Sequence, residues 1–179
     1  MKMKSAVLFV LLAFLTPTFS YAQVNTLNQY KLGAGDLVRI SVYGQDDLTL
    51  ETLIPDVGVV NYPYLGEIAL LGMTISDLES YIYNGLKPDY LVEPSVSVSI
   101  VEYRPFFING EVEKPGGYAF QPGLTIDKAA ALAGGYTERA SKTKIFIVRD
   151  INGEQVTISA DRSIAILPGD IISIEQSFF

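Results

Sequence analysis

The sequence predicts an α+β protein made of two small β-rich units, each with one short helix. Three observations predict this class. Short runs of β-branched and aromatic residues are separated by glycine, proline and asparagine turns. Two other segments repeat apolar residues at helical spacing behind a threonine. Short motifs of the first half also recur in the second half in a different order, which indicates two related units rather than a fixed-period repeat.

The expected strands are short and regularly interrupted by turns. Residues 96–100 alternate valine or isoleucine with serine, the pattern of a half-buried strand. Asn152-Gly153 accepts the positive φ angles of a tight turn, so a hairpin is expected around it. Pro115-Gly116-Gly117 is expected to turn the chain. The predicted strands are residues 37–42, 96–100, 106–108, 145–148, 155–158 and 171–174.

Two helices are expected, each opened by a threonine N-cap. Thr74 caps the first, with Asp77 in its first turn and apolar residues on one face up to Leu86. Thr125 caps the second, which has an alanine-rich face. Gly134-Gly135 is expected to end it, because glycine takes the left-handed conformation at little energetic cost.

Three motifs recur between the halves. Gly35-Asp36 and its strand resemble residues 169–174, while residues 72–75 resemble 123–126, and Gly66-Glu67 resembles residues 110–111. In the repeated Gly-Asp, glycine permits a tight turn and aspartate can bond the backbone ahead of a strand. We interpret it as a structural turn rather than a catalytic aspartate. A boundary between units is expected near residues 102–105.

The first residues predict export. Lys2 and Lys4 precede an apolar run over residues 6–15, and Ser20-Tyr21-Ala22 is a cleavage site, the layout of a signal peptide. The alternative, a membrane anchor, needs roughly 20 apolar residues. We expect residues 1–22 to be removed. The chain has no cysteine, which excludes disulfides, thiolate chemistry and a lipidated N-terminal cysteine.

The charge is acidic and unevenly placed. Removing residues 1–22 takes away two lysines and no acid, which leaves 11 basic and 20 acidic residues and disfavours nucleic acid as a partner. Residues 46–56 are acidic and residues 139–149 are basic. These stretches are either two solvated faces or the two sides of a head-to-tail subunit contact. The candidate contact residues are Asp46, Asp47, Lys142 and Lys144.

The composition argues against an enzyme. There is no histidine, so the common general base is missing and a Ser-His-Asp triad is excluded. Asp46-Asp47 could act as a glycosidase pair, but adjacent carboxylates on a strand point to opposite faces. We expect no catalytic residue, cofactor site or metal site. The tyrosines, at positions 62, 64, 81, 83 and 90, either pack in cores and interfaces or stack on sugars.

Several motifs in order resemble the polysaccharide biosynthesis/export family of Gram-negative envelope proteins. In the first half these are YKLGAGD (residues 30–36), YPYLGEI (62–68), GMT (72–74) and EPSVSV (93–98). In the second half they are GEV (110–112), KPG (114–116) and AGG (133–135). The family-motif residues expected to shape the fold are Gly35, Asp36, Gly66, Gly72, Thr74, Gly110, Pro115, Gly116, Gly134 and Gly135.

The resemblance implies an export domain over residues 23–102 and a soluble-ligand-binding β-grasp domain over residues 103–179. It implies a periplasmic component of capsule or exopolysaccharide export, peripheral to the outer membrane at most. Family members form rings and dock on an inner-membrane co-polymerase. Without a lipidated cysteine or a C-terminal amphipathic helix, this chain is expected to need a separate outer-membrane channel. The alternative is a β-grasp module that binds a glycan or small ligand without forming a conduit.

Overall fold

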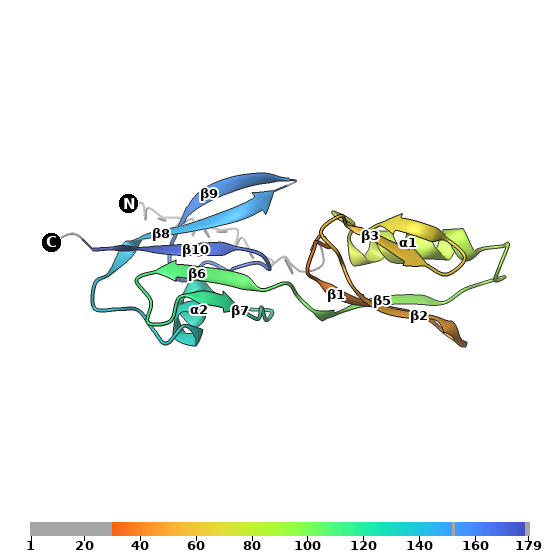
Figure 1. Ribbon diagram of the computed structural model, residues 1–179, viewed down its shortest axis with the longest axis horizontal. Coiled ribbons are helices and arrows are strands. Elements are labelled where there is room, and N and C mark those ends of the chain that lie inside the picture. Colours follow the sequence, from red (N-terminus) through yellow and green to blue (C-terminus); the bar gives the residue numbers. More distant parts are fainter. Residues whose placement is uncertain (1–29, 152, 178–179) are drawn as a thin grey trace, which may run out of the picture.

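Two β-rich units lie end to end along the long axis of the molecule (Figure 1). The structure is a computed structural model that describes residues 30–151 and 153–177. The predicted signal peptide, residues 1–22, lies outside the described residues, as does the aromatic pair Phe178-Phe179. Residues 103–105 connect the last strand of the first unit to the first strand of the second. The α+β class expected from the sequence is confirmed.

The first unit is built on an antiparallel sheet. Its central strand, β1 (Leu37–Val42), pairs with β2 (Gln45–Leu53) on one side and with β5 (Val96–Glu102) on the other. A separate hairpin joins β3 (Val59–Tyr62) to β4 (Gly66–Ala69). The helix α1 (Ile75–Leu86) packs against β5.

Local chemistry explains where α1 begins. The Thr74 hydroxyl accepts a hydrogen bond from the Asp77 backbone N–H, and the Asp77 carboxylate accepts one from the Thr74 N–H. This reciprocal capping satisfies two backbone donors that have no partner inside the helix. Leu78, Ile82 and Leu86 recur on one face and are fully buried, so the helix is fixed to the core of the first unit.

The second unit has one mixed sheet in the order β7-β6-β10-β8-β9, and its helix is α2 (Ile126–Leu132). Its first and last strands, β6 and β10, run parallel at the centre, while the other pairs are antiparallel. This topology is β-grasp-like. The strands are β6 (Phe106–Gly110), β7 (Gly116–Tyr118), β8 (Ala140–Ile151), β9 (Glu154–Ala160) and β10 (Ile171–Gln176).

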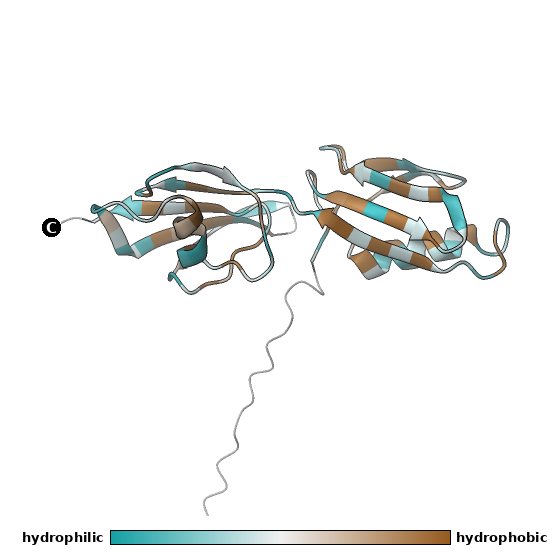
Figure 2. Cartoon of the chain, turned by 90° about the horizontal axis from the view of Figure 1, so that it is seen from below, coloured by the Kyte–Doolittle hydropathy of each residue, from teal (hydrophilic) through white to brown (hydrophobic). Residues whose placement is uncertain are grey.

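Each unit has its own hydrophobic core. The first core gathers apolar residues of β1, β3, β4, β5 and α1, and the second gathers those of β6, β8, β10 and α2. Figure 2 shows hydrophobic and polar residues alternating along the strands, as expected for sheets with one buried face. Tyr103 packs against both cores. Neither described helix is long and apolar enough to cross a lipid bilayer.

The turn predicted at Pro115-Gly116-Gly117 is wrong in its position. The chain turns before Pro115, and Gly116 begins β7, which pairs antiparallel with β6 through Ile108↔Gly116. Ladder hydrogen bonds override the weak strand propensity of glycine. Three strands of the first unit were not predicted: the acidic β2 and the two short strands β3 and β4. The pairing of β2 with β1 and its buried Leu48 outweigh its charges, and β3 and β4 pair with each other.

Candidate functional site at the junction of the two units

The first Gly-Asp turn ends in a buried carboxylate. Gly35 has a φ angle of +88°, and Asp36 is 0% exposed. The Tyr30 hydroxyl shares its one proton between the two carboxylate oxygens, at 2.7 and 2.8 Å, and the Gly33 N–H donates to the carboxylate at 2.8 Å. The carboxylate also accepts a hydrogen bond from the Arg104 backbone N–H at 2.9 Å. Asp36 therefore ties the entry of β1 to the connection between the units.

The second Gly-Asp turn has the same construction. Gly169 has a φ angle of +83°, and Asp170 is 1% exposed. The Arg149 Nε and Nη2 atoms donate to the two carboxylate oxygens at 2.9 and 2.7 Å, and the Leu167 N–H donates at 2.7 Å. Such a two-point guanidinium–carboxylate pair is strong and orients both groups. Each unit thus holds its turn with a buried aspartate that faces an arginine.

Arg104 reaches both units. Its Nη1 atom lies 3.4 Å from an Asp36 carboxylate oxygen in the first unit, and its Nε donates to the Pro168 carbonyl of the second unit at 3.3 Å. Its guanidinium carbon lies 5.5 Å from the centroid of the Tyr30 ring, within the range of a cation–π contact. The side chain is 26% exposed. Arg104 is therefore a shared partner of the two turns.

Glycines leave the space that Arg104 occupies. A Cβ atom at Gly33 would lie 1.6 Å from Arg104 Nη1, and one at Gly169 would lie 2.7 Å from Nε. Both distances are far below van der Waals contact. The guanidinium could not keep its place if either residue had a side chain. Gly33, two residues before the first Gly-Asp pair, and Gly169 of the second pair thus leave room for an arginine between the units.

Aromatic rings also pack at the junction. Tyr103 packs edge-to-face against Tyr30 of the first unit at 5.3 Å and against Phe120 of the second at 5.4 Å. Burial, helped by the Asp36 carboxylate that accepts its hydrogen bond, raises the pKa of Tyr30 far above its ordinary value. Burial also raises the pKa of Tyr103. Both hydroxyls therefore stay protonated at neutral pH.

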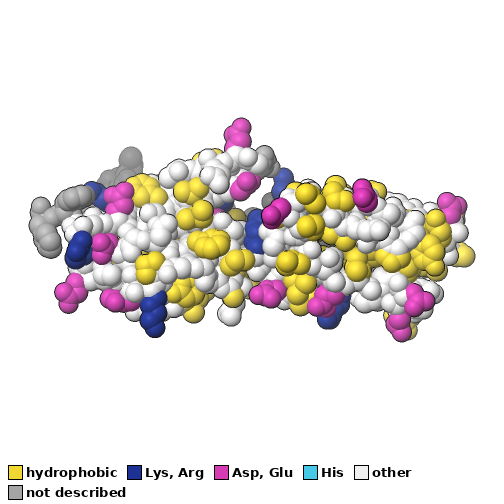
Figure 3. Space-filling model, in the orientation of Figure 1, with side chains coloured by type: hydrophobic (Ala, Val, Ile, Leu, Met, Phe, Trp, Pro, Cys, Tyr) yellow, Lys and Arg dark blue, Asp and Glu magenta, His cyan; other side chains and the backbone are white. Residues whose placement is uncertain are grey.

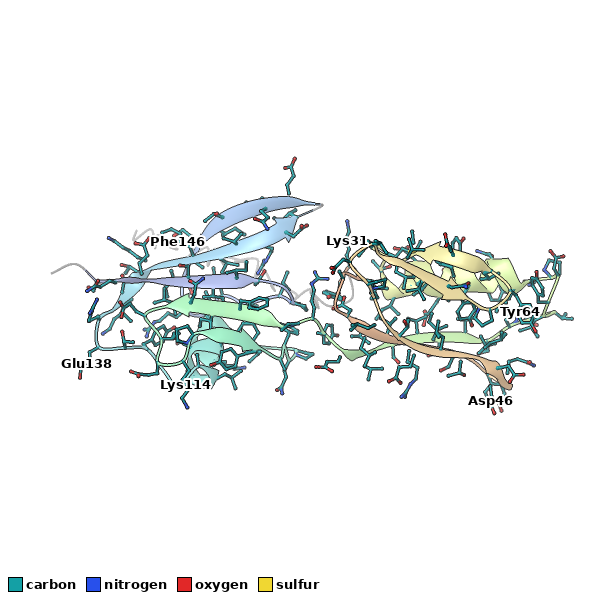
Figure 4. All side chains as sticks on the ribbon, viewed as in Figure 1. Lys31, Asp46, Tyr64, Lys114, Glu138 and Phe146 are labelled. Carbon is teal, nitrogen blue, oxygen red and sulfur yellow. The ribbon has the colours of Figure 1, made fainter. Side chains whose placement is uncertain are left out.

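A cleft of about 910 Å³ opens beside this junction. Lys31, which Figure 4 places at the junction, lines it together with Arg104 and Arg149. Of the described residues that line it, Asp150 is the one carboxylate, and it accepts a hydrogen bond from the Gly153 N–H. The walls combine these three cationic side chains with apolar side chains and glycine backbone, so the cleft suits a ligand with both polar and apolar surface. A pair of carboxylates for glycoside hydrolysis is not found among its described lining residues.

The structure spreads the other predicted motif residues over several turns. Gly66 opens β4 with a φ angle of +70°, and Gly72 precedes the Thr74 cap of α1 with a φ angle of +80°. Pro115 lies between β6 and β7. These residues do not share a site with the Gly-Asp turns, except that Gly72 lines the cleft.

The motif glycines of the second unit allow a left-handed backbone and a close approach. A Cβ atom at Gly110 would lie 2.0 Å from the Ile174 carbonyl of β10. Gly134 and Gly135, just after α2, have φ angles of +86° and +99°. Their N–H groups donate to Ala131 and Ala130 carbonyls at the end of the helix. Gly110 therefore allows β6 and β10 to pack closely, and Gly134 and Gly135 end α2.

The two predicted contact stretches lie at opposite ends of the molecule. Asp46 and Asp47 are exposed on β2, at the free end of the first unit, where Figure 4 labels Asp46. Lys142 and Lys144 lie near the start of β8, at the free end of the second unit (Figure 1). The chain does not bring them together itself. Their pairing between subunits stays a prediction.

The tyrosines divide between core and surface. Tyr62 is 1% exposed and donates to the Leu48 carbonyl at 2.8 Å, and burial raises its pKa to about 12. Tyr83 accepts a hydrogen bond from Lys87. Tyr64 and Tyr90, by contrast, are exposed and lie ring against ring. Within residues 30–151 and 153–177, no cluster of three or more acidic, histidine or cysteine ligands could hold a metal ion.

Sequence reasoning identified the Gly-Asp turns but missed Arg104 and Arg149. Asp36 and Arg104 are 68 residues apart, and Asp170 and Arg149 are 21 apart. No spacing rule connects partners at such separations. Only the position of Arg104 beside Pro105, at the expected boundary between units, could have marked it.

Comparison with known proteins agrees with the motif order. The profile of the family described as polysaccharide biosynthesis/export protein matches residues 24–101, and the profile of the SLBB domain matches residues 105–159. The exopolysaccharide production protein ExoF of Rhizobium meliloti (strain 1021) is 32% identical over 162 residues, which cover 80% of this chain and 37% of that protein.

A second relative is the EPS I polysaccharide export outer membrane protein EpsA of Ralstonia nicotianae (strain ATCC BAA-1114 / GMI1000). It is 25% identical over 183 residues, covering 82% of this chain and 47% of that protein. The protein of the same description from Ralstonia solanacearum is 22% identical, covering 82% and 48%. The chain therefore spans less than half the length of these relatives. With both units matched in order, the chain belongs to the polysaccharide biosynthesis/export protein family.

Proposed function

We propose that this chain is a non-enzymatic component of a capsule or exopolysaccharide export apparatus in the periplasm. The observation that carries the proposal is the match of the export profile to the first unit and of the SLBB profile to the second. Relatives named for exopolysaccharide production and for polysaccharide export support the same role. The chain would act by holding a path for the polymer rather than by reacting with it.

The construction of the junction supports a mechanical role. Arg104 bonds to groups of both units, and Tyr103 packs on a ring from each. Two cores joined in this way move as one elongated body, because separating them would expose the buried Asp36 and break several contacts together. A rigid subunit with two different ends can serve as one segment of an assembled wall.

The proposed assembly is a homo-oligomer, most simply a ring. A contact between two different patches is heterologous, and it closes into a ring when the rotation between subunits permits. Asp46 and Asp47 at one end could meet Lys142 and Lys144 at the other end of the next copy. Such a contact would place the long axes end to end along the ring. The ring would lie between an inner-membrane co-polymerase and a separate outer-membrane channel.

A second candidate function is a module that binds a glycan or small soluble ligand without forming a conduit. The cleft of about 910 Å³ beside Arg104 favours this alternative, since its size and its few cationic groups among apolar side chains are typical of a small-molecule site. The native mass of the purified chain separates the two. A closed oligomer supports the conduit, whereas a monomer at every concentration that binds a glycan supports the module.

Deletion of the gene tests the export role. The proposal expects loss of polysaccharide outside the cell, restored by the wild-type gene. Unchanged release of polymer would overturn it. Incubating purified polymer with the purified protein tests the glycosidase alternative, and the proposal expects the polymer to keep its length.

A further inference from the structure

Exposed apolar side chains gather at the free end of the first unit. Three loops form this end: the β1–β2 turn, the β3–β4 turn and the loop of residues 87–95. Figure 3 shows hydrophobic side chains there, and Figure 4 places Tyr64 and Asp46 at the same end. The exposed fractions are 89% for Tyr43, 86% for Val92, 65% for Tyr64 and 50% for Tyr90. Side chains this exposed add little apolar burial to the fold.

The backbone at Tyr64 is in a conformation that disfavours tyrosine. The Leu65 N–H donates to the Tyr62 carbonyl at 3.2 Å, which closes a tight turn with Pro63 and Tyr64 at its corners. Tyr64 has a φ angle of +65° and, within the described part of the chain, it is the one residue other than glycine with positive φ. Proline followed by positive φ defines a type II turn, where glycine or asparagine is favoured at the second corner. A tyrosine there keeps strain in the turn.

Tyr64 is held against Tyr90. The two ring centroids are 4.7 Å apart with planes tilted by 35°. Tyr90 follows α1, and its N–H donates to the Leu86 carbonyl, which fixes the start of its loop. Two loops thus meet through a pair of rings whose outer faces remain open to solvent. We name Tyr64 and Tyr90 the tyrosine platform.

We propose that the tyrosine platform binds uncharged pyranose units of a polysaccharide chain. This inference rests on the proposed export function and adds a place where polymer touches this subunit. The C–H faces of pyranose rings pack on aromatic faces, while nearby polar groups fix orientation. Glycine would fit this turn without strain but has no ring, so a tyrosine here presents an aromatic face at the cost of a strained backbone.

Charge around the platform favours a neutral glycan over other occupants. Asp89 and Glu93 are exposed in the loop of residues 87–95 that carries Tyr90. Carboxylates accept hydrogen bonds from sugar hydroxyls, but they repel the phosphates of an anionic membrane surface. The four exposed apolar side chains are too few to form by themselves the roughly 1,200 Å² or more of a stable protein–protein interface. The subunit contact proposed at this end uses the charges of Asp46 and Asp47 on β2 and leaves the platform rings free.

Titration with neutral hexasaccharides tests the platform. The purified full chain is titrated with cellohexaose, laminarihexaose and maltohexaose, and binding is followed by calorimetry and by NMR of the tyrosine rings. At least one sugar should bind and shift the ring resonances of Tyr64 and Tyr90. Absence of binding to all three at millimolar concentration would overturn the proposal.

Tyr64→Gly separates binding from folding. Glycine suits the positive φ, so this variant should melt no lower than the wild type, yet it should bind about tenfold or more weakly, as expected for loss of one stacking ring. Tyr64→Phe keeps the aromatic ring face and should keep most of the affinity for the sugar. Phe107→Leu removes an exposed ring from β6 in the second unit and should change nothing. Equal binding by Tyr64→Gly and wild type would contradict the platform.

A cellular readout distinguishes this inference from the export role. Cells that carry Tyr64→Gly combined with Tyr90→Ala should release less polymer than cells with the wild type. If this variant releases the normal amount of polymer while gene deletion abolishes release, the export role is supported and sugar binding by the tyrosine platform is contradicted. Unchanged release on gene deletion would contradict both the export role and the platform.

Discussion

At the residue scale, two buried carboxylates hold the turns on which the molecule depends. Asp36 and Asp170 each follow a glycine with positive φ and each face an arginine. Burying a charge is unfavourable unless every lone pair finds a donor. Asp36 has donors from Tyr30, Gly33 and Arg104. A substitution here should therefore cost more than the loss of one hydrogen bond.

Asp36→Ala should destabilise the first unit by about 3–5 kcal/mol, because it leaves a buried tyrosine hydroxyl and two backbone N–H groups without their acceptor. Chemical denaturation measures the change in the free energy of unfolding. Asp46→Ala, an exposed carboxylate on β2, serves as the control and should stay within about 0.5 kcal/mol of the wild type. Equal stabilities for the two variants would contradict the structural role of Asp36.

Alkaline pH should weaken the first unit through Tyr62. Burial raises the pKa of Tyr62 in the folded protein to about 12, against 10.0 for an unperturbed tyrosine. Above pH 10 the unfolded chain loses this proton while the folded chain keeps it, so the folded state binds more protons. The stabilisation is complete below pH 10, and the free energy of unfolding falls as pH rises from about 10 to about 12.

Tyr62→Phe isolates this contribution. The variant loses the hydrogen bond to the Leu48 carbonyl and should be about 1 kcal/mol less stable at pH 7. Its stability should then decline less steeply between pH 10 and 12 than that of the wild type, with Tyr30 accounting for part of what remains. Parallel pH profiles for the two proteins would show that Tyr62 is not the responsible group.

At the element scale, short-range chemistry sets the helices, and glycine conformation ends one of them. Thr74 and Asp77 start α1, and Gly134 and Gly135 follow α2 in left-handed conformations. A Cβ atom at Gly135 would meet no atom within 4 Å, whereas one at Gly134 would lie 3.1 Å from Glu113 Cβ. A side chain at Gly135 would therefore cause backbone strain alone, whereas a side chain at Gly134 would also crowd Glu113.

Gly135→Val should lower stability by about 1–2 kcal/mol, because a β-branched residue is strained at a φ angle of +99°. Because a Cβ atom here meets no neighbour, the loss of stability reports the cost of the backbone conformation alone. Gly135→Asn should lose less, since asparagine tolerates the left-handed region. Thermal unfolding compares the variants, and an unchanged melting temperature for Gly135→Val would contradict the assignment.

The sequence predicts elements whose own residues carry a clear pattern and misses strands that form only because a neighbouring strand pairs with them. Helix caps and alternating strands such as residues 96–100 need only their neighbours, and these elements were predicted correctly. The acidic β2 and the glycine-rich β7 are strands because β1 and β6 pair with them. Arg104 was missed for a different reason: its side-chain partners lie 64 and 68 residues away in sequence, so no local pattern marks it.

At the scale of the whole molecule, Arg104 should decide whether the two units tumble together. Arg104→Ala removes the side-chain contacts to Asp36 and Pro168 but leaves the backbone N–H bond to Asp36 and the Tyr103 packing. ¹⁵N relaxation should give one correlation time for the wild type and shorter, separate values for the two units of the variant. Arg139→Ala, an exposed arginine near Glu111, is the control. One shared correlation time in Arg104→Ala would show that the junction holds without this residue.

Charges at the two ends should control self-association. Assembly through them should weaken as salt rises, with a Debye length of roughly 8 Å at physiological ionic strength. Replacing Lys142 and Lys144 by glutamate should weaken it further, and replacing Asp46 and Asp47 by lysine in the same chain should restore part of it. Native mass spectrometry over a salt series measures the oligomeric state in all three cases.

Two results would contradict this assembly. A wild type that is monomeric at every salt and protein concentration would show that the chain does not assemble alone. An oligomer that ignores both charge reversals would keep self-association but place the contact elsewhere, on other exposed surfaces of the two units.

The location of polymer in a strain that lacks this gene tests the export role most directly. Polysaccharide is quantified in the medium, in the periplasm and in the cytoplasm, and its chain length is measured in each fraction. Polymer should be lost from the medium, while repeat-unit synthesis continues and the chain length of any released material is unchanged. Normal release, or released polymer of altered length, would contradict a role in export and point instead to a role in binding or trimming the polymer.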